Sequence, residues 1–209
     1  MTVSRCVILC AGPVADPAAL APLLRPDDLI VAADGGLRLA KRLGVAPAVV
    51  VADLDSAAPA EAAGEPLIRL PVRKDCTDAA AAAEYAVSCG CREILLLGAT
   101  GGRLDHEYGA LLLLVQLARQ GVHAVIADEK NRIEAHTASP VHPAVMPGWT
   151  LSLFAFGAPV EDLCIESADY PLAHYRLLPD DPLCVSNTAL SGCTVTFSDG
   201  LLLIYRSHD

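Results

Sequence analysis

The first 128 residues alternate between short, uninterrupted apolar runs and segments with helical patterning. A run that is apolar at every position predicts a strand buried on both faces, because a strand with one wet face alternates apolar and polar residues. Strands of this kind separated by helices indicate a parallel sheet with helices on both faces. The apolar runs are 6–10, 29–33, 48–52, 67–70, 94–97 and 122–127. The helical segments are 17–24, 35–43, 77–88 and 104–119.

The pattern changes after residue 128, where the helical periodicity ends. Short β-type runs follow, separated by turns rich in proline and glycine, at 150–156, 163–166, 183–185, 194–197 and 201–205. They predict an antiparallel β-sandwich or barrel, and we expect the sandwich. The predicted fold class is therefore α/β: an N-terminal parallel-sheet α/β domain over residues 1–128, followed by a C-terminal antiparallel β-sandwich domain over residues 129–209. Both segments are long enough for a core of their own.

The chain is acidic, with 25 Asp and Glu against 15 Lys and Arg and a formal net charge of -10. This balance argues against a nucleic-acid-binding face, which needs clustered basic residues. The longest apolar stretch, 108–115, is too short to cross a bilayer, and the N-terminus lacks the features of a signal peptide. No Cys-x-x-Cys motif occurs among the eight cysteines. We therefore expect a soluble cytoplasmic protein with reduced thiols, without nucleic-acid or membrane partners.

Acidic residues follow several of the apolar runs at the point where each run ends. Asp34 and Asp53 directly follow two of them, and Asp105 follows a glycine-rich turn after a third. In an open parallel sheet, ligands bind beyond the carboxyl ends of the strands. These loops therefore bring carboxylates and glycines to one edge of the predicted sheet, where we expect a binding site.

Two acidic clusters extend this predicted site. Asp53 and Asp55 are two residues apart, so in an extended loop their side chains point to the same side, which suits one hard cation. The alternative is that one caps the next helix and the other is solvated. Thr77 is placed to cap the alanine-rich helix, which leaves Asp78 either in the site or as a helix-dipole residue. Lys74 is either a phosphate contact or a solvated charge.

The glycine-rich turn 98–103 has the sequence Gly98-Ala99-Thr100-Gly101-Gly102-Arg103 and precedes a helical segment. Backbone N–H groups at such a turn can bind a phosphate, and Arg103 can add a charge-assisted hydrogen bond. The turn matches neither the P-loop nor the dinucleotide fingerprint, so by itself it is a weak signal. The acidic net charge is compatible with a phosphate ligand, because a metal ion can bridge carboxylates and phosphates.

Taken in order, these blocks resemble the thiamine pyrophosphokinase (thiamine diphosphokinase) family, and the resemblance covers nearly the whole chain. In the first part the matching stretches are Ala33-Asp34-Gly35-Gly36, Asp53-Leu54-Asp55-Ser56, Lys74-Asp75-Cys76-Thr77-Asp78 and Gly98-Ala99-Thr100-Gly101-Gly102-Arg103-Leu104-Asp105-His106. In the second part they are Ser152-Leu153-Phe154, Tyr170-Pro171-Leu172, Val185-Ser186-Asn187 and Gly200-Leu201-Leu202-Leu203. Ordered blocks at family-like spacing are specific, whereas any one of them alone is not.

The resemblance implies an ATP-dependent transfer of a diphosphoryl group to the hydroxyl of thiamine, giving thiamine diphosphate and AMP. It also implies a homodimer with shared active sites. The implied magnesium (Mg2+) ligands are Asp53, Asp55 and Asp78, with Asp34 and Asp105 as further members of the catalytic acidic centre. The implied nucleotide-binding residues are Gly35, Gly36, Lys74, Thr77, Thr100, Gly101, Gly102 and Arg103. The implied thiamine-binding residues are Ser186 and Asn187.

The chain departs from the family pattern at several positions. Ala52 and Leu54 replace a glycine and a phenylalanine, Gly109-Ala110 stand where an asparagine is usual, and Thr188 replaces an acidic residue. The alternatives are a related diphosphokinase that acts on a hydroxymethylpterin and a non-catalytic nucleotide or thiamine sensor. The complete β domain favours thiamine over a pterin, and the complete set of carboxylates favours an enzyme over a sensor.

Overall fold

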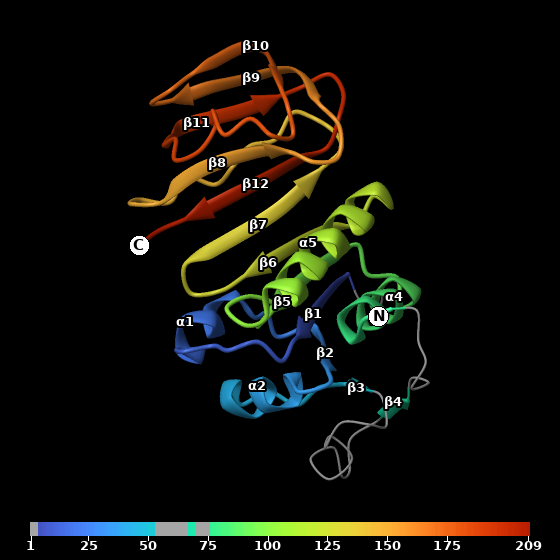
Figure 1. Cartoon of the computed structure of the whole chain (residues 1–209). Helices are drawn as coiled ribbons and strands as arrows, with labels where there is room; N and C mark the ends of the chain where they lie inside the picture. The colour runs from blue at the N-terminus through green and yellow to red at the C-terminus, as the bar shows by residue number, and fades with distance from the viewer. Residues whose placement is uncertain (1–3, 53–66, 70–75) are drawn as a thin grey trace. The chain divides into compact units, whose positions relative to one another are not determined.

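The computed structural model describes residues 4–52, 67–69 and 76–209, and the chain divides into two compact units, Met1–Glu129 and Lys130–Asp209 (Figure 1). Three of the predicted site residues, Asp53, Asp55 and Lys74, lie outside the described residues.

The first unit is built on parallel strands. Their order along the sheet is β4 (Leu67–Arg69), β3 (Val49–Ala52), β2 (Leu29–Ala33), β1 (Arg5–Leu9), β5 (Glu93–Leu97) and β6 (His123–Ala127). Every neighbouring pair among these strands is parallel. The predicted apolar runs therefore correspond to strands, and the predicted parallel sheet is confirmed.

The central strands of this sheet are buried on both faces. On one face, Val7 and Leu9 of β1 pack with Leu20 of α1 (Pro17–Leu20) and Leu39 of α2 (Gly36–Leu43). Because side chains alternate along a strand, Ile8 points to the other face, and it too is fully buried. Helices α4 (Asp78–Ser88) and α5 (Leu104–Arg119) also pack against the strands, and the short 3-10 helix η1 (Ala21–Leu23) continues α1. Uninterrupted apolar strands are the consequence of this double covering.

The strand order reverses at β1, which lies between β2 and β5. The chain runs outward from β1 to β4 and then returns to the other side of β1 with β5 and β6. After β1 the chain crosses to β2 on one side, and after β5 it crosses to β6 on the other. In open α/β sheets such a point opens a crevice at the carboxyl ends of the strands. The topology itself provides a place for a ligand beyond β1 and β5.

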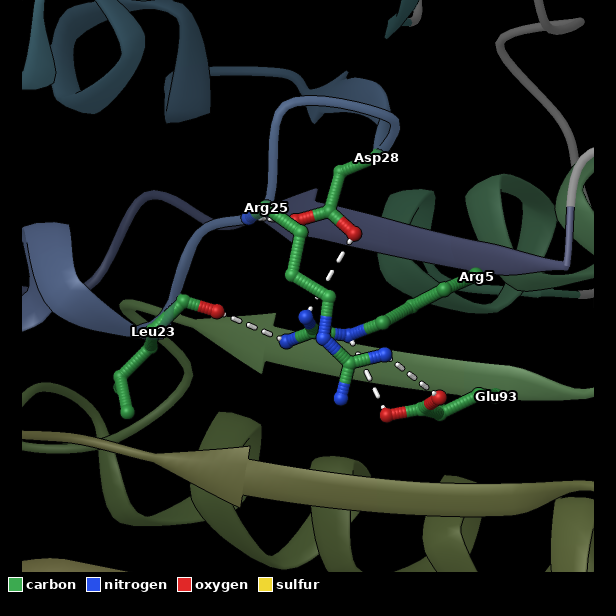
Figure 2. A network of polar contacts seen from close by, with 5 residues as sticks. All are labelled: Arg5, Leu23, Arg25, Asp28 and Glu93. Carbon is green, nitrogen blue, oxygen red and sulfur yellow. Dashed lines mark hydrogen bonds and ion pairs between the residues drawn. The ribbon is translucent and has the colours of Figure 1, made fainter.

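A buried ion-pair network lies at the amino-terminal end of β1 (Figure 2). Arg5 donates from Nη2 to the Leu23 carbonyl at 2.9 Å, and it pairs with Asp28 (Nη1–Oδ1, 3.5 Å) and Glu93 (Nε–Oε1, 3.3 Å). The side chains of Arg5 and Asp28 are only 8% and 1% exposed. Charges this deeply buried need their partners, because an unpaired charge inside a protein is strongly destabilising.

The second unit, all of whose residues 130–209 are described, consists of antiparallel sheets. One has the order β7 (Asn131–His136), β12 (Leu202–Ser207) and β8 (Thr150–Ala155), and the other has the order β10 (Leu172–Leu177), β9 (Val160–Ala168) and β11 (Ala189–Thr196). Leu151 and Leu153 of β8 meet Leu163 and Ile165 of β9 in one buried cluster. Since the cluster takes alternate residues from both sheets, the predicted β-sandwich is confirmed.

The strand predictions for this unit were wrong at particular places. The run 183–185 forms a turn, since Asp181 Oδ1 accepts from the Leu183 N–H (2.9 Å) and the Val185 N–H donates to the Pro182 carbonyl (3.3 Å). Strands β7 and β10 are absent from the predicted runs, because each carries several polar residues and buries only part of its length. A strand with a wet face leaves no continuous apolar run.

All eight cysteines are free, and the buried ones are Cys6, Cys10, Cys91, Cys184 and Cys193. Across residues 4–52, 67–69 and 76–209, no helix combines the length and the apolar character that crossing a membrane requires.

Candidate active site

A cavity of about 660 Å³ opens where the strand order reverses. Its walls are the loops that leave β1, β2 and β5, together with the first turns of α4 and α5. The predicted site residues that line it are Asp34, Thr77, Asp78, Thr100, Gly102, Arg103 and Asp105. The fold therefore brings together residues that lie up to 71 positions apart in the sequence (105 minus 34).

Asp34 lines the cavity from the end of β2 in a left-handed backbone conformation, with a φ of 46°. Aspartate is one of the few residues that tolerate this conformation well. Its N–H donates to the Val51 carbonyl of β3 at 2.8 Å, which extends the pairing of β2 and β3 by one residue before the chain turns into α2. The sheet therefore fixes the backbone from which the half-buried Asp34 side chain extends.

Gly35 and Gly36 begin the turn into α2, and neither lines the cavity. A Cβ at Gly36 would lie 1.8 Å from the carbonyl oxygen of Leu9, so only glycine lets α2 begin directly against β1. A Cβ at Gly35 would lie 2.9 Å from the Arg38 guanidinium and 3.0 Å from the Ala11 side chain. Both predicted nucleotide-binding glycines therefore have a packing requirement of their own.

The substitution Gly36→Ala is expected to destabilise the chain by about 3 kcal/mol, because α2 must move away from β1 to admit the methyl group. Chemical denaturation followed by circular dichroism measures the free energy of unfolding. Gly109→Ala is the matched control: Gly109 lies inside α5, and a Cβ there meets nothing within 4 Å. Alanine at 109 should stabilise the helix by about 0.5–1 kcal/mol. Equal effects of the two substitutions would contradict the packing argument.

Thr77 and Asp78 form the N-terminus of α4. Thr77 Oγ1 accepts from the Ala80 N–H at 3.2 Å, which confirms the predicted cap, and Asp78 is the first helical residue. The Asp78 carboxylate thus lies at the positive end of the helix dipole. Burial, reinforced by the charge of Asp78, raises the pKa of Cys10 to about 12. Cys10 therefore lines the cavity as a neutral thiol.

The loops after β1 and β5 are held together through glycines. The Gly12 N–H donates to the Gly98 carbonyl at 2.7 Å, and a Cβ on Gly12 would lie 2.4 Å from that oxygen. Gly98 itself has a φ of 68°, which glycine adopts without strain. Gly12 is not among the predicted site residues, although it closely follows the apolar run 6–10 in the way that the predicted aspartates follow theirs.

Asp128 holds the glycine-rich turn 98–103 from the end of β6. Its Oδ2 accepts from the Thr100 hydroxyl at 2.6 Å, and the residue is only 8% exposed. Because the hydroxyl proton is shared with Asp128, Thr100 can only accept a hydrogen bond from a ligand. Asp128 is also missing from the predicted site residues. Its position directly after the apolar run 122–127 is the signal that could have found it.

Arg103 and Asp105 form a bidentate ion pair at the start of α5. The Nε–Oδ1 distance is 3.1 Å and the Nη2–Oδ2 distance is 2.5 Å, and the His106 N–H donates to Oδ1 at 3.0 Å. The hydrogen bonds from Arg103 lower the pKa of the Asp105 carboxyl below its usual value, and the His106 N–H adds to the effect. Asp105 is therefore an ionised hydrogen-bond acceptor at neutral pH.

The predicted thiamine-binding residues Ser186 and Asn187 lie in the second unit, just before β11. Asn187 Oδ1 accepts from the N–H groups of Tyr170 (3.0 Å) and Thr188 (2.8 Å), and Nδ2 donates to the Tyr170 carbonyl (2.7 Å). The buried amide of Asn187 thus joins two loops and uses both lone pairs of its oxygen. Ser186 is exposed in a left-handed conformation (φ 60°), and its N–H donates to Ser152 Oγ at 3.0 Å.

Family models match both units of the chain. The model described as "Thiamin pyrophosphokinase, catalytic domain" matches residues 20–126, and the model described as "Thiamin pyrophosphokinase, vitamin B1 binding domain" matches residues 140–202. The chain belongs to the thiamin pyrophosphokinase family. Membership makes it a transferase of the thiamin diphosphokinase type, and it favours neither the pterin-specific enzyme nor the non-catalytic sensor.

Named thiamin pyrophosphokinases resemble the chain along most of its length. Thiamine pyrophosphokinase from Bacillus subtilis (strain 168) is 27% identical over 173 residues, which cover 79% of this chain and 81% of the relative. The crystal structure of the Bacillus subtilis enzyme superposes with a TM-score of 0.89 at 23% identity and covers 99% and 100% of the two chains. The Geobacillus thermodenitrificans structure gives 0.84 at 27% identity and covers 98% of each.

Each of the two thiamin pyrophosphokinase matches includes a different part of the predicted site. The catalytic-domain match includes the predicted acidic and nucleotide-binding residues from Asp34 to Asp105, and the vitamin B1 binding match includes Ser186 and Asn187. The positions of Asp53, Asp55 and Lys74 relative to the cavity stay predictions, since these residues lie outside the described part of the chain.

Proposed function

We propose that the chain transfers the diphosphoryl group of ATP to the hydroxyl of thiamine and releases thiamine diphosphate and AMP. The observation that carries the proposal is that Asp34, Asp78 and Asp105 line one cavity with the glycine-rich turn 98–103, in a member of the thiamin pyrophosphokinase family. Carboxylates beside backbone N–H groups suit a polyphosphate that binds together with a divalent cation.

Magnesium fits the donor set around this cavity. Carboxylate oxygens are the protein ligands that Mg2+ prefers, and carboxylates that share a cavity repel one another without a cation. We propose Asp53, Asp55 and Asp78 as its ligands, with Asp34 and Asp105 as further carboxylates of the acidic centre. When bound, the ion supplies charge neutralisation for the phosphate oxygens.

The triphosphate is proposed to bind at the turn 98–103 and at the start of α4. The Gly102 N–H donates to Glu107 Oε1 at 3.0 Å. The proposed donors are therefore the other backbone N–H groups of the turn and the Arg103 guanidinium, and Lys74 and Thr77 contribute from the neighbouring loop. The thiamine hydroxyl then attacks the β-phosphorus in line, and AMP leaves. In such a reaction the protein acts mainly by positioning the reactants and stabilising charge.

The lowered pKa of Asp105 bears on the proton of the thiamine hydroxyl. An efficient general base has a pKa near the working pH, so a carboxylate whose pKa is lowered below its usual value is a poor base. We therefore assign Asp105 to holding Arg103 in position through their bidentate pair.

Thiamine is proposed to bind through the β domain, where Ser186 offers an exposed hydroxyl and Asn187 holds the loop. We propose a cytoplasmic homodimer with shared active sites. One feature that supports a second copy is the apolar stripe of Leu104, Tyr108 and Leu112, which are spaced four residues apart on α5 and are 80%, 57% and 37% exposed.

The proposed reaction is tested with the purified chain, ATP, magnesium and thiamine, by chromatography of the nucleotides and thiamine species. We expect AMP and thiamine diphosphate to form in equal amounts, and AMP to stay at background without thiamine, with hydroxymethylpterin in its place, or with the magnesium chelated. AMP release with the pterin alone would overturn the thiamine assignment. Thiamine binding without AMP release would support the sensor instead.

A further inference from the structure

An aspartate, a cysteine and a histidine gather on the sheet β10-β9-β11, and the proposed function uses none of them. Asp162 and Cys164 belong to β9, and His174 belongs to β10. One ligating atom from each of the three lies within 4.8 Å of the other two. The cluster is open to solvent, since the side chains of Asp162 and His174 are 53% and 80% exposed.

Paired β-bulges bring these side chains together. The register of the two strands shifts on either side of Tyr175, which pairs with Leu163. Before this pair β10 carries one residue more than β9, and after it β9 carries one residue more than β10. His174 and Asp162 lie in these bulges with left-handed φ values of 52° and 56°. Because a bulge redirects a side chain, the imidazole and the carboxylate face each other across the strands.

The three residues bring an oxygen, a sulfur and a nitrogen atom that can bind a metal close to one another. The ring atom His174 Nδ1 lies 2.7 Å from Asp162 Oδ1, and the backbone N–H of His174 donates to Cys164 Sγ at 3.2 Å. The nearby guanidinium of Arg176 is paired with Glu161 at 2.8 Å. One ligating atom from each of the three side chains therefore lies close enough to the other two to share one ion.

We propose that Asp162, Cys164 and His174 bind one divalent transition-metal ion of the zinc class, with the remaining coordination position open to solvent. Sulfur, nitrogen and carboxylate oxygen are the ligands of zinc and similar ions, whereas magnesium and calcium take oxygen ligands. A thiolate and a carboxylate together neutralise the charge of a divalent ion. Binding releases the proton of the thiol and any proton held between Nδ1 and Oδ1.

Cobalt(II) added to the full chain is the probe, because a cobalt–thiolate bond gives a charge-transfer absorption that oxygen and nitrogen ligands do not. We expect one thiolate-bound cobalt per chain and loss of the absorption when zinc is added in excess. Cys164→Ser should abolish the absorption, and His174→Ala should weaken cobalt binding by at least about tenfold. Since the altered side chains are not buried, circular dichroism should show that both variants keep the fold.

Cys89→Ser is the matched control, because Cys89 is an exposed free thiol in the first unit and should leave the cobalt spectrum unchanged. The proposal is overturned by the absence of a thiolate absorption or by an absorption that survives Cys164→Ser. Cys164→Ser leaves the cavity of the first unit unchanged, including its Cys10 thiol, so an absorption that this variant removes does not depend on the proposed diphosphoryl transfer.

Discussion

Replacing Asp78 with asparagine is expected to lower magnesium-dependent AMP formation by at least about 100-fold while the protein stays folded. Asp78 lines the cavity as the first residue of α4, and the substitution keeps its size but removes the charge proposed to hold the cation. The structural cost is small, because a charge at a helix N-terminus contributes only about 0.3–1 kcal/mol. The rate at saturating ATP and thiamine gives the loss, and a thermal melt checks the fold.

Glu84→Gln is the matched control for this prediction, since Glu84 is an exposed acid on the same helix and does not line the cavity. Its turnover should equal that of the unaltered chain. Asp53→Ala and Asp55→Ala are expected to abolish turnover in the same way as the change at 78. Near-normal rates in the variants of all three aspartates would remove the metal assignment, and a normal rate for Asp78→Asn alone would make Asp78 a helix-dipole residue.

Replacing Arg5 with alanine is expected to lower the free energy of unfolding by about 3–5 kcal/mol. The change leaves the Asp28 carboxylate, which is 1% exposed, without the guanidinium beside it, and it removes the donor from the Leu23 carbonyl (Figure 2). A domain of ordinary stability unfolds at about 5–15 kcal/mol, so this loss is a large share of the total. Denaturant titration followed by circular dichroism measures it.

Arg25→Ala is the control for Arg5→Ala, because both arginines pair with Glu93 but the Arg25 side chain is 53% exposed. Water already screens that pair, so its removal should change stability far less than the change at Arg5. The backbone N–H of Arg25, which donates to Asp28 Oδ2 at 2.6 Å, stays in the variant. If both variants lost the same small share of the free energy of unfolding, Arg5 would not be required to stabilise the buried charge of Asp28.

The parallel sheet could be predicted because burial on both faces leaves a local mark in the sequence. Each of β1, β2, β3 and β5 is almost entirely apolar, since neither face of the strand meets water. The sequence pattern of the β-sandwich is less distinctive. Strands such as β7 and β10 mix polar with apolar residues, and only their pairing partners distinguish them from loops.

The position of the candidate site was predictable to the extent that ligands gather at the carboxyl ends of parallel strands. That rule placed Asp34 and Asp105 in one cavity, and the capping pattern correctly placed Thr77 before α4. The same rule applied to every strand would have added Gly12 and Asp128. Their roles depend on close contacts with Gly98 and Thr100, and such contacts between distant segments have no local signature.

The sequence by itself determined the two domains, the parallel sheet and the family, because strand burial, turn residues and motif order are local properties of the chain. Only the tertiary structure decided which side chains meet. The strand order places the reversal point at β1, which lets loops from three strands share a cavity. The bulges of β9 and β10 bring His174 against Asp162, twelve positions away in the sequence (174 minus 162). Both arrangements arise from strand pairing and register, which depend on residues far apart in the chain.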